Sequence, residues 1–370
     1  MIKLLVVDDS ALMRRLLGNL FAQHSDFEVA FARDGIEALD RVHDFAPDVV
    51  TLDINMPHMD GLACLNQIML VRPCPVVMLS SLTEAAADVT LQAMALGAVD
   101  FVAKPAGAIS LSMDELGPRL VASVRAASRA RVRGSRRLAE RVRLRVAGLA
   151  GDTVARAIPA PPTSAETRPR YAAGPVNGVV LVGCSTGGPP ALDTLLAALP
   201  ADFPWPMLIA QHMPGSFTGP LARRLNRLCA LEVLEVTRPM KLAPGQVYVA
   251  KGEADMIISP RPGGPVVTAA PASAEHRWHP SVDRMVSTAM QHLDAARLIG
   301  VLMTGMGDDG AAAMTRLREA GGRTIAEAEE TAVVWGMPGE LVRAGGADIV
   351  APIEDIAGHL LGWLPRVGAA

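Results

Sequence analysis

The sequence has no long apolar run and no excess of charge of one sign. None of its 370 residues belongs to an uninterrupted apolar stretch of the roughly 18 residues that a membrane span requires, so we expect no transmembrane helix. The formal net charge of −3 gives no support to a protein whose main task is electrostatic binding of nucleic acid. The apolar start ends at Asp8 and Asp9, too early for a secretory signal, and we therefore expect a cytoplasmic protein.

Cysteine is also scarce. The four cysteines, Cys64, Cys74, Cys184 and Cys229, show none of the spacings of a metal site, and we interpret them as reduced and mostly buried. Cys184 stands directly before Ser185 and is a conceivable second nucleophile, but a buried position at a strand end is the favoured interpretation. The cysteines therefore give no indication of a metal centre.

Length and patterning predict two domains joined by a linker. The chain exceeds one ordinary core, and residues 1–122 alternate apolar strand-like runs with amphipathic helical runs. The same alternation resumes for residues 176–366. The strands that we expect are 3–7, 27–31, 49–52, 76–79 and 101–103, then 179–182, 207–210, 247–250, 299–303 and 322–326. Such alternation is typical of parallel sheets, so we predict an α/β fold class with two doubly wound, mainly parallel-sheet domains.

The linker, residues 123–175, differs in composition from both flanking regions. Between Arg125 and Arg145 lie nine arginines and one acid, Glu140. This run could be a nucleic-acid or membrane patch, but a solvated helix that extends from the first domain and steers a partner is favoured. Beyond Ile158, prolines recur among Ala, Thr and Ser, which is typical of an extended, flexible linker.

Acidic residues follow two of the expected strands in the first domain. Asp8 and Asp9 come after the first strand and Asp53 after the third, and side chains at the carboxyl edge of a parallel sheet converge on a crevice. Clustered carboxylates repel one another unless a cation lies among them, and Mg2+ is the natural occupant. Ser80 and Lys104 follow two further strands and reach the same edge. Together these groups can accept a phosphoryl group, with Asp53 as the attacking group and Mg2+ and Lys104 neutralising the developing charge.

Each of these residues alone is more often a capping acid or a surface lysine. In order, however, the segments Val6-Val7-Asp8-Asp9-Ser10, Leu52-Asp53-Ile54-Asn55-Met56-Pro57 and Lys104-Pro105 resemble the receiver domain of bacterial response regulators. The resemblance covers nearly all of residues 1–122 and implies a flavodoxin-like fold. The roles that it implies are phospho-acceptor for Asp53, metal ligand for Asp8, Asp9, Asp53 and the Asn55 backbone carbonyl, and switch residue for Ser80, Phe101 and Lys104.

A glycine-rich loop follows the first strand of the second domain. The loop, Gly183-Cys184-Ser185-Thr186-Gly187-Gly188, comes directly after the apolar run 179–182. Its glycines allow a sharp turn and leave room for a substrate carbonyl and for N–H donors, as around a serine nucleophile. A glycine-rich turn between a strand and a helix can equally hold a phosphate. The loop alone leaves both interpretations open.

Two more strand ends supply possible partners for Ser185. His212 follows the second strand and Asp309 the fourth, so all three side chains should leave one edge of the sheet. A histidine can take the serine proton, and a carboxylate can fix the tautomer of that histidine. Backbone N–H groups near Thr186 and Met306 could form an oxyanion hole. Taken singly, His212 is more often a structural histidine, and Asp309 or its neighbour Asp308 more often caps a helix.

Among the other histidines only His279 competes for the role of base, and a substrate contact or a role in helix entry is favoured for it. The chain order Ser185, His212, Asp309 differs from the order serine, acid, histidine of the α/β-hydrolases. The glycine-serine-glycine pattern therefore does not indicate that fold.

The loops Gly-x-Ser-Thr-Gly-Gly, Gln-His-Met-Pro and Thr-Gly-Met-Gly-x-Asp-Gly, in that order behind a receiver, closely resemble the CheB family. These are chemotaxis response-regulator protein-glutamate methylesterases, and the resemblance spans both domains. It implies a Rossmann-like methylesterase domain with Ser185 as the nucleophile, His212 as the general base and Asp309, not Asp308, as the orienting acid. It also places the Met306 backbone at the oxyanion and Thr186 beside the nucleophile.

The resemblance implies a phosphorylation-activated serine esterase that hydrolyses glutamate methyl esters on the cytoplasmic helices of chemoreceptors to glutamate and methanol, and that also deamidates receptor glutamine. A histidine kinase would phosphorylate Asp53 with Mg2+ in the receiver, and catalysis itself would need no cofactor. We expect no nucleic-acid partner. Two alternatives stay open: a receiver-gated hydrolase with a non-chemotactic partner, and a response regulator whose arginine-rich linker binds nucleic acid, although no helix-turn-helix pattern is evident.

Overall fold

The computed structural model describes residues 1–104, 109–130 and 176–364, the side chains of 109–115 excepted, and the chain forms two compact units, each with its own parallel sheet. Most of the predicted linker, residues 131–175, lies outside the described residues. The boundaries at 122/123 and 175/176 stay predictions, and helix α5 (Ile109–Ala127) continues past the first of them. None of the helices in the described part of the chain combines the length and apolarity of a membrane span.

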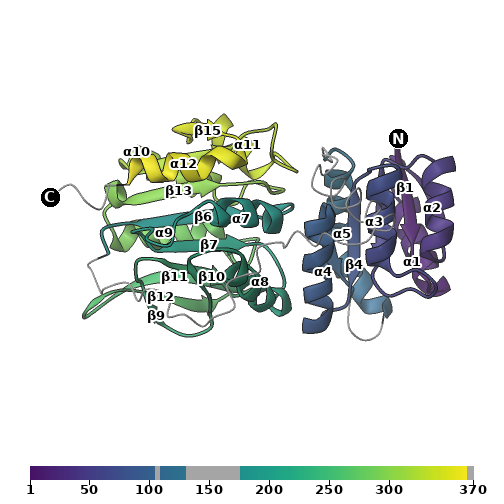
Figure 1. Ribbon diagram of the computed structural model, residues 1–370, viewed down its shortest axis with the longest axis horizontal. Coiled ribbons are helices and arrows are strands. Elements are labelled where there is room, and N and C mark those ends of the chain that lie inside the picture. The colour runs from purple at the N-terminus through teal and green to yellow at the C-terminus, as the bar shows by residue number, and fades with distance from the viewer. Residues whose placement is uncertain (105–108, 131–175, 365–370) are drawn as a thin grey trace, which may run out of the picture. The chain divides into compact units, whose positions relative to one another are not determined.

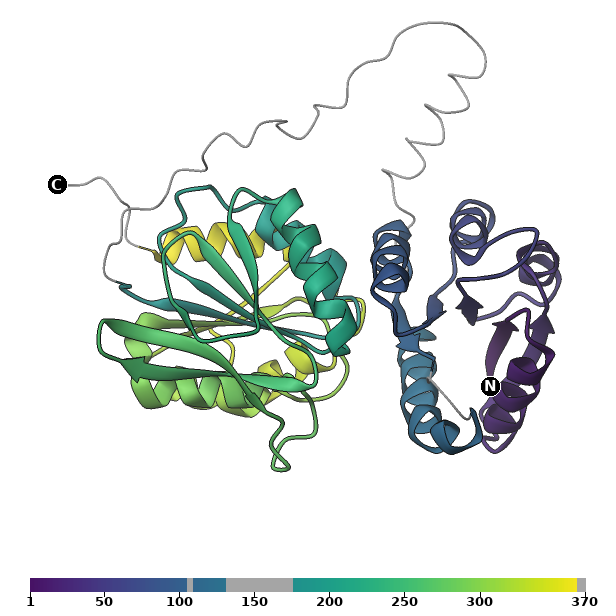
Figure 2. The ribbon, with the colours of Figure 1, turned by 90° about the horizontal axis from the view of Figure 1, so that it is seen from below.

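The first unit is a five-stranded parallel sheet covered by helices on both faces (Figure 1). Its strands, β1 (Ile2–Val7), β2 (Phe27–Ala32), β3 (Val49–Asp53), β4 (Val76–Ser80) and β5 (Asp100–Ala103), lie in the order β2-β1-β3-β4-β5. The remaining helices are α1 (Ala11–Ala22), α2 (Gly35–Asp44), α3 (Gly61–Val71) and α4 (Glu84–Leu96). Figure 2 shows α1 and α5 on one face of the sheet and α2, α3 and α4 on the other. This is the flavodoxin-like strand order, and all five strands were expected.

Short polar side chains begin three of these helices. Ser10 accepts a hydrogen bond from the Met13 N–H, and Asp34 and Asp60 do the same at the starts of α2 and α3. Such caps satisfy backbone donors that the first turn of a helix leaves unpaired. Gly61, the first residue of α3, must be glycine because an added Cβ would lie 2.1 Å from the Asp53 carbonyl oxygen. The start of α3 is therefore packed directly on the end of β3.

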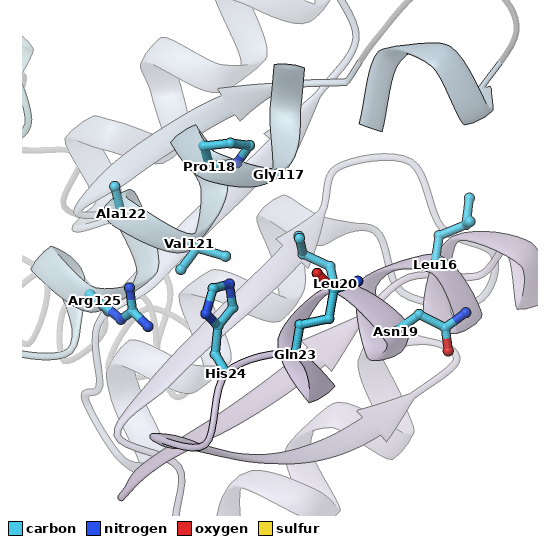
Figure 3. A pocket seen from close by; sticks show the side chains of 10 residues that line it. All are labelled: Leu16, Asn19, Leu20, Gln23, His24, Gly117, Pro118, Val121, Ala122 and Arg125. Carbon is cyan, nitrogen blue, oxygen red and sulfur yellow. The ribbon is translucent and has the colours of Figure 1, made fainter. Parts of the chain in front are cut away.

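An open pocket of about 580 Å³ lies between helices α1 and α5 (Figure 3). Leu16 and Leu20 line it from α1, and Val121 lines it from α5. The helices meet closely beside it, because a Cβ on Gly117 would lie 2.9 Å from Leu20 Cδ1. Arg125, at the rim, binds Asp26 through two hydrogen bonds of 2.8 Å. Packing and this ion pair together hold the end of α5 against the rest of the first unit.

The second unit is built on a seven-stranded parallel sheet in the order β15-β14-β13-β6-β7-β10-β8. The strands are β6 (Val179–Cys184), β7 (Met207–Gln211), β8 (Glu232–Val236), β10 (Gln246–Ala250), β13 (Leu298–Leu302), β14 (Arg323–Glu327) and β15 (Ile349–Ala351). The helices are α7 (Gly188–Ala197), α8 (Gly215–Leu228), α9 (Val282–His292), α10 (Ala311–Glu319), α11 (Met337–Arg343) and α12 (Ile353–Trp363), with a 3-10 turn η1 (Ala295–Arg297). The predicted fold class, two doubly wound and mainly parallel domains, is confirmed.

A small antiparallel sheet and the helices cover the two faces of this larger sheet (Figure 2). The small sheet consists of β9 (Met240–Lys241), β11 (Ala254–Arg261) and β12 (Gly264–Pro271), in the order β11-β12-β9. Helices α9, α10 and α11 pack against one another, and α9 also packs on β11, whereas α7, α8 and α12 form a separate layer. The buried core of the unit joins β6, β7 and β10 to α9, α10 and β11.

The strand order places the predicted site. The chain runs outward from β6 through β7 on one side and then returns to continue through β13 and β14 on the other side. Ligands of open α/β sheets bind at the carboxyl ends of the strands where the order reverses in this way. Gly183 of β6 is paired with Ala210 of β7 and with Leu302 of β13. The loops that carry Ser185 and His212, and the loop after β13, therefore leave the sheet side by side.

Candidate active site

Backbone and side-chain hydrogen bonds pin the loop that carries Ser185. The Ser185 N–H donates to the Thr304 carbonyl at 2.9 Å, and the Ser185 carbonyl accepts from Gly188 N–H at 2.8 Å and from Gln211 Nε2 at 2.9 Å. Gly187 has a φ of +78°, the left-handed region that favours glycine. At Gly188 an added Cβ would collide with the Gln211 side chain. Both glycines are thus required by the turn, which leaves Ser185 half-buried at the strand end.

His212 is held at one ring nitrogen by a carboxylate. Its Nε2 lies 2.8 Å from Asp309 Oδ2, and the imidazole side chain is only 5% exposed. An ionised carboxylate only accepts hydrogen bonds, so Nε2 carries the hydrogen and Nδ1 is the unprotonated nitrogen of the neutral ring. Nδ1 is buried and has no hydrogen-bond partner among the residues that the structure describes. The ring therefore has a free basic nitrogen within the site.

Asp309 sits at the N-terminus of α9. Its carboxylate accepts from the backbone N–H groups of Val282 and Asp283, at 2.7 and 3.0 Å, and from Ser281 Oγ at 3.1 Å. Burial alone would raise the pKa of Asp309, but the hydrogen bond with His212 and these backbone donors outweigh it, so the pKa is lowered. The helix dipole favours the anion in the same place. Asp309 therefore stays ionised and holds the tautomer of His212.

The two helices beside the site cap each other. While Asp309, which precedes α10, binds the first turn of α9, Asp283 of α9 accepts from the Ala313 N–H of α10 at 2.8 Å. Such reciprocal capping satisfies donors that both helix starts would otherwise leave unpaired. The position of the orienting carboxylate is therefore fixed by the packing of α9 on α10.

The loop after β13 carries Met306 between two glycines. Gly305 donates to the Val334 carbonyl at 3.0 Å and accepts from the Met337 N–H at 2.9 Å, and Gly307 has a φ of +92°. Gly305 also packs on Ser185, because an added Cβ would lie 2.8 Å from the Ser185 Cβ. Gly305, the residue before Met306, thus packs on the serine loop, and Thr186 is buried with its carbonyl bonded to Thr304; the oxyanion role of both backbones stays a prediction.

Two of the competing interpretations do not fit the geometry. Burial strongly raises the pKa of the Cys184 thiol, whose Sγ donates to Gln211 Oε1 at 3.1 Å, so this cysteine stays protonated and is a poor nucleophile. His279 pairs through Nδ1 with Asp255 Oδ1 at 3.0 Å and not with Asp309. Its neighbour Ser281 begins α9, so the structure places His279 at the entry of a helix.

Sequence reasoning missed Thr304, which links the serine loop to the end of β13, and the buried acid Glu327 beneath it. Thr304 accepts from Ser185 through its carbonyl, donates from Oγ1 to the Thr186 carbonyl at 2.8 Å, and donates its N–H to Glu327 Oε2 at 2.7 Å. Glu327 is 1% exposed and also accepts from Thr331 Oγ1 at 3.0 Å. Burial raises the pKa of Glu327 to about 7. The signal that could have found it is its place at the end of β14, the same strand-end rule that found the other acids.

Sequence reasoning also missed Trp278, whose indole stacks on the His212 ring with the centroids 5.1 Å apart and the planes 7° from parallel. The sequence around Trp278 is an irregular Trp/Pro-rich segment with no periodic signal. Nothing in that segment indicates a contact with the base.

The first unit collects the predicted acids at the carboxyl edge of its sheet. Carboxylate oxygens of Asp8, Asp9 and Asp53 lie within 4.8 Å of one another, and Lys104 Nζ lies 2.8 Å from both Asp8 Oδ2 and Asp53 Oδ2. Burial raises the pKa of Asp53 despite the opposing effect of Lys104, and the pKa of Lys104 is itself raised by its two carboxylate partners against the effect of burial. Two of the three carboxylates thus share one ammonium group, and Asp9 lies beside them. This oxygen-rich, electron-rich cluster fits a hard divalent cation such as Mg2+.

The remaining predicted receiver residues, Ser80, Phe101 and Asn55, differ from one another in burial. Ser80 is buried at the end of β4, and Phe101 is buried within β5. Asn55 is exposed two residues after Asp53, and the role of its carbonyl as a metal ligand stays a prediction.

Known proteins resemble both units. The family model described as CheB methylesterase matches residues 180–360, and the one described as response regulator receiver domain matches residues 4–113. The protein-glutamate methylesterase/protein-glutamine glutaminase 2 of Rhodopseudomonas palustris strain BisB18 is 58% identical over 363 residues, 98% of this chain and 98% of that protein. The protein-glutamate methylesterase/protein-glutamine glutaminase 3 of Rhodospirillum rubrum is 52% identical over 366 residues, 99% of this chain and 97% of that protein.

The solved catalytic domain of the Thermotoga maritima CheB methylesterase is 35% identical, with a TM-score of 0.49, and the match covers 51% of this chain and 99% of that chain. The matches to these relatives span both units. The chain therefore belongs to the CheB family, in which a response-regulator receiver domain is joined to a methylesterase domain.

Proposed function

We propose that the second unit is a serine esterase that hydrolyses glutamate methyl esters of chemoreceptors to glutamate and methanol. The observation that carries the proposal is the buried pair of His212 and Asp309, which leaves Nδ1 of the imidazole as a base without a partner at the edge where Ser185 leaves the sheet. The names of the relatives from Rhodopseudomonas palustris and Rhodospirillum rubrum supply the substrate class.

The proposed reaction begins with proton transfer from Ser185 Oγ to Nδ1 of His212 as the oxygen attacks the ester carbonyl. Asp309 stabilises the imidazolium through Nε2, and backbone N–H groups near Thr186 and Met306 stabilise the oxyanion. Collapse of the tetrahedral intermediate breaks the bond to the methoxy oxygen, which takes the proton from Nδ1 and leaves as methanol. Water then attacks the acyl-serine with Nδ1 as base, the acyl–oxygen bond breaks, and Nδ1 returns the proton to Ser185 Oγ as glutamate is released. An amide would react in the same way, with ammonia as the leaving group.

We also propose that phosphorylation of Asp53 by a histidine kinase activates the esterase. Mg2+, when bound by Asp8, Asp9 and Asp53, would supply charge neutralisation for the phosphoryl group. Lys104, already in contact with the Asp53 carboxylate, would bind an oxygen of the incoming phosphoryl group, and Ser80 lies at the end of the neighbouring strand. On this proposal the protein works in the cytoplasm in chemotaxis adaptation, without a nucleic-acid partner.

The test is release of methanol from membranes that carry methylated receptors. We expect Ser185→Ala to lose activity and Ser287→Ala, on α9 outside the site, to keep it. Asp53→Ala should keep the basal rate and lose its increase with a small phosphodonor, whereas Asp40→Ala, an exposed acid on α2, should keep that increase. Full activity of Ser185→Ala would contradict the triad. Hydrolysis of a model ester together with no methanol from receptors would point to a different partner.

A further inference from the structure

The proposed base lies against an aromatic ring that belongs to none of the active-site motifs. The indole of Trp278 and the imidazole of His212 are 5.1 Å apart at their centroids and 7° from parallel, which is an offset stack. The Arg277 guanidinium lies 5.4 Å from the same indole. Trp278 therefore has two neighbours of its ring, a permanent cation and the imidazole that becomes a cation during the reaction proposed above.

A buried acid clamps the segment that carries Trp278. Asp255 of β11 accepts from the backbone N–H of Ser273 at 3.2 Å and from that of Ser281 at 2.9 Å, so it binds both sides of the segment. The same carboxylate also binds two side chains, His279 Nδ1 at 3.0 Å and Arg284 Nη1 at 2.6 Å. Asp255 is 1% exposed, and a buried charge with four donors is costly to displace. The clamp therefore fixes both sides of the segment that carries the indole.

Trp278 also reaches the loop of the acid and the oxyanion. A Cβ added to Gly307 would lie 3.6 Å from the indole Nε1, an ordinary van der Waals distance, so the ring lies beside this loop. Trp278 and Asp309 line one cavity of about 330 Å³. The indole thus stacks on the base and lies beside the loop that holds its acid.

Asp309 alone does not fix the orientation of the imidazole. One hydrogen bond at Nε2 fixes a single edge atom, and the ring can still turn about that bond and move Nδ1. A parallel stack fixes the plane of the ring. Its π-face also attracts the imidazolium that forms when Nδ1 takes a proton.

We propose that Trp278 is a positioning residue for His212, which holds the plane of the imidazole, and with it the direction of Nδ1, and which stabilises the protonated ring. The inference rests on the triad proposed above. A group that acts on the base in the transition state changes kcat and leaves substrate binding unchanged. This separates positioning from a simple role as a wall of the substrate cleft.

The experiment measures kcat and KM for methanol release by the full-length protein. We expect Trp278→Leu and Trp278→Ala to lower kcat about tenfold, equivalent to about 1.4 kcal/mol, with KM within about twofold of the unsubstituted protein. Trp278→Phe, which keeps a ring face, should recover most of the loss. Trp363→Ala is the matched control, because Arg323 lies 5.1 Å from that indole in the same kind of pair outside the site. It should leave both constants unchanged.

An unchanged kcat in Trp278→Leu would overturn the inference, and so would a Trp278→Phe protein no better than Trp278→Leu or a rise in KM alone. Thermal unfolding of each variant identifies loss of folding, and the comparison of leucine with phenylalanine, both large enough to fill the site, still decides the question if the alanine variant unfolds. Ser185→Ala in the same assay tests the triad separately. Activity in that variant contradicts the proposed function, whereas its inactivity together with a normal Trp278→Leu protein contradicts only the role of Trp278.

Discussion

Replacing Glu327 with glutamine measures how much the ionisation of this buried carboxyl group, beneath the serine loop, changes the free energy of unfolding. Glutamine keeps an oxygen to accept the Thr304 N–H and gains an amide that can donate to Thr331 Oγ1, so both hydrogen bonds of Glu327 have a counterpart. The substitution therefore removes the titration and retains the shape. We expect methanol release by Glu327→Gln to stay within a few-fold of the unsubstituted protein.

The magnitude follows from the pKa of Glu327, which burial raises from 4.5 to about 7. Below pH 4.5 the carboxyl is neutral in both the folded and unfolded chain. Between pH 4.5 and 7 the unfolded chain releases the proton while the folded chain keeps it, so the free energy of unfolding falls as pH rises through this window. At 1.36 kcal/mol for each pH unit, the total loss is about 3 kcal/mol above pH 7. Glu327→Gln lacks this loss.

The measurement uses the native fluorescence of the protein. All four tryptophans, Trp205, Trp278, Trp335 and Trp363, belong to the second unit, so denaturant unfolding followed by tryptophan emission reports that unit in the full-length chain. The stability of Glu327→Gln relative to the unsubstituted protein should rise by about 3 kcal/mol between pH 4.5 and pH 8. Glu319→Gln, an exposed glutamate at the end of α10, should show a difference of less than about 0.5 kcal/mol at every pH. A pH-independent difference for Glu327→Gln would refute the reasoning.

Three further predictions concern the two sites. Asp309→Asn should lower kcat for methanol release by about 10³- to 10⁴-fold, because asparagine no longer holds the hydrogen on Nε2 of His212; a smaller loss than tenfold would mean that the acid does not set the tautomer. Cys184→Ala should keep kcat within about twofold, because the buried thiol stays protonated, and a large loss would restore Cys184 as a candidate nucleophile. Chelation of Mg2+ should abolish labelling of Asp53 by a small phosphodonor and leave the basal rate of methanol release unchanged; labelling that persists in a chelator would contradict the metal assignment.

The strand ends were predictable because buried parallel strands are continuous apolar runs, and whatever polar residue ends such a run lies at the sheet edge. Ser185, His212 and Asp53 all follow this rule. Edge strands escaped it: β8 is Glu-Val-Leu-Glu-Val with charged, partly exposed positions, and β15 has only three residues. The hairpin of β11 and β12 escaped too, because prolines and glycines interrupt its apolar pattern, although that cluster is itself a turn signal.

The contacts that orient the site were not predictable in the same way. Asp255 and Ser281 belong to different elements, and their bond depends on the packing of α9 on β11. The stack of Trp278 on His212 depends in turn on that bond. The local sequence does not indicate that Trp278 lies near His212, because the two residues are 66 positions apart in the chain. His212 itself was predicted only because it follows a strand.

Two acids at the same sheet edge act on stability in opposite directions. The folded-state pKa of Asp309 is lowered from 3.8, so its contribution is fully present above that value and is lost as pH falls through the folded-state pKa. Glu327 has the opposite shift, and its cost develops between pH 4.5 and about 7. The backbone N–H groups in the first turn of α9 stabilise the ionised form of Asp309. Catalysis and folding therefore both need the ionised form of this carboxyl group. Glu327 is ionised at a net expense in stability, and a protein selected for stability alone would carry glutamine there. Environments that shift the pKa values of two neighbouring carboxyl groups in opposite directions are a feature of active sites. Removal of the Asp309 carboxylate should therefore destabilise this enzyme, whereas neutralisation of Glu327 should stabilise it.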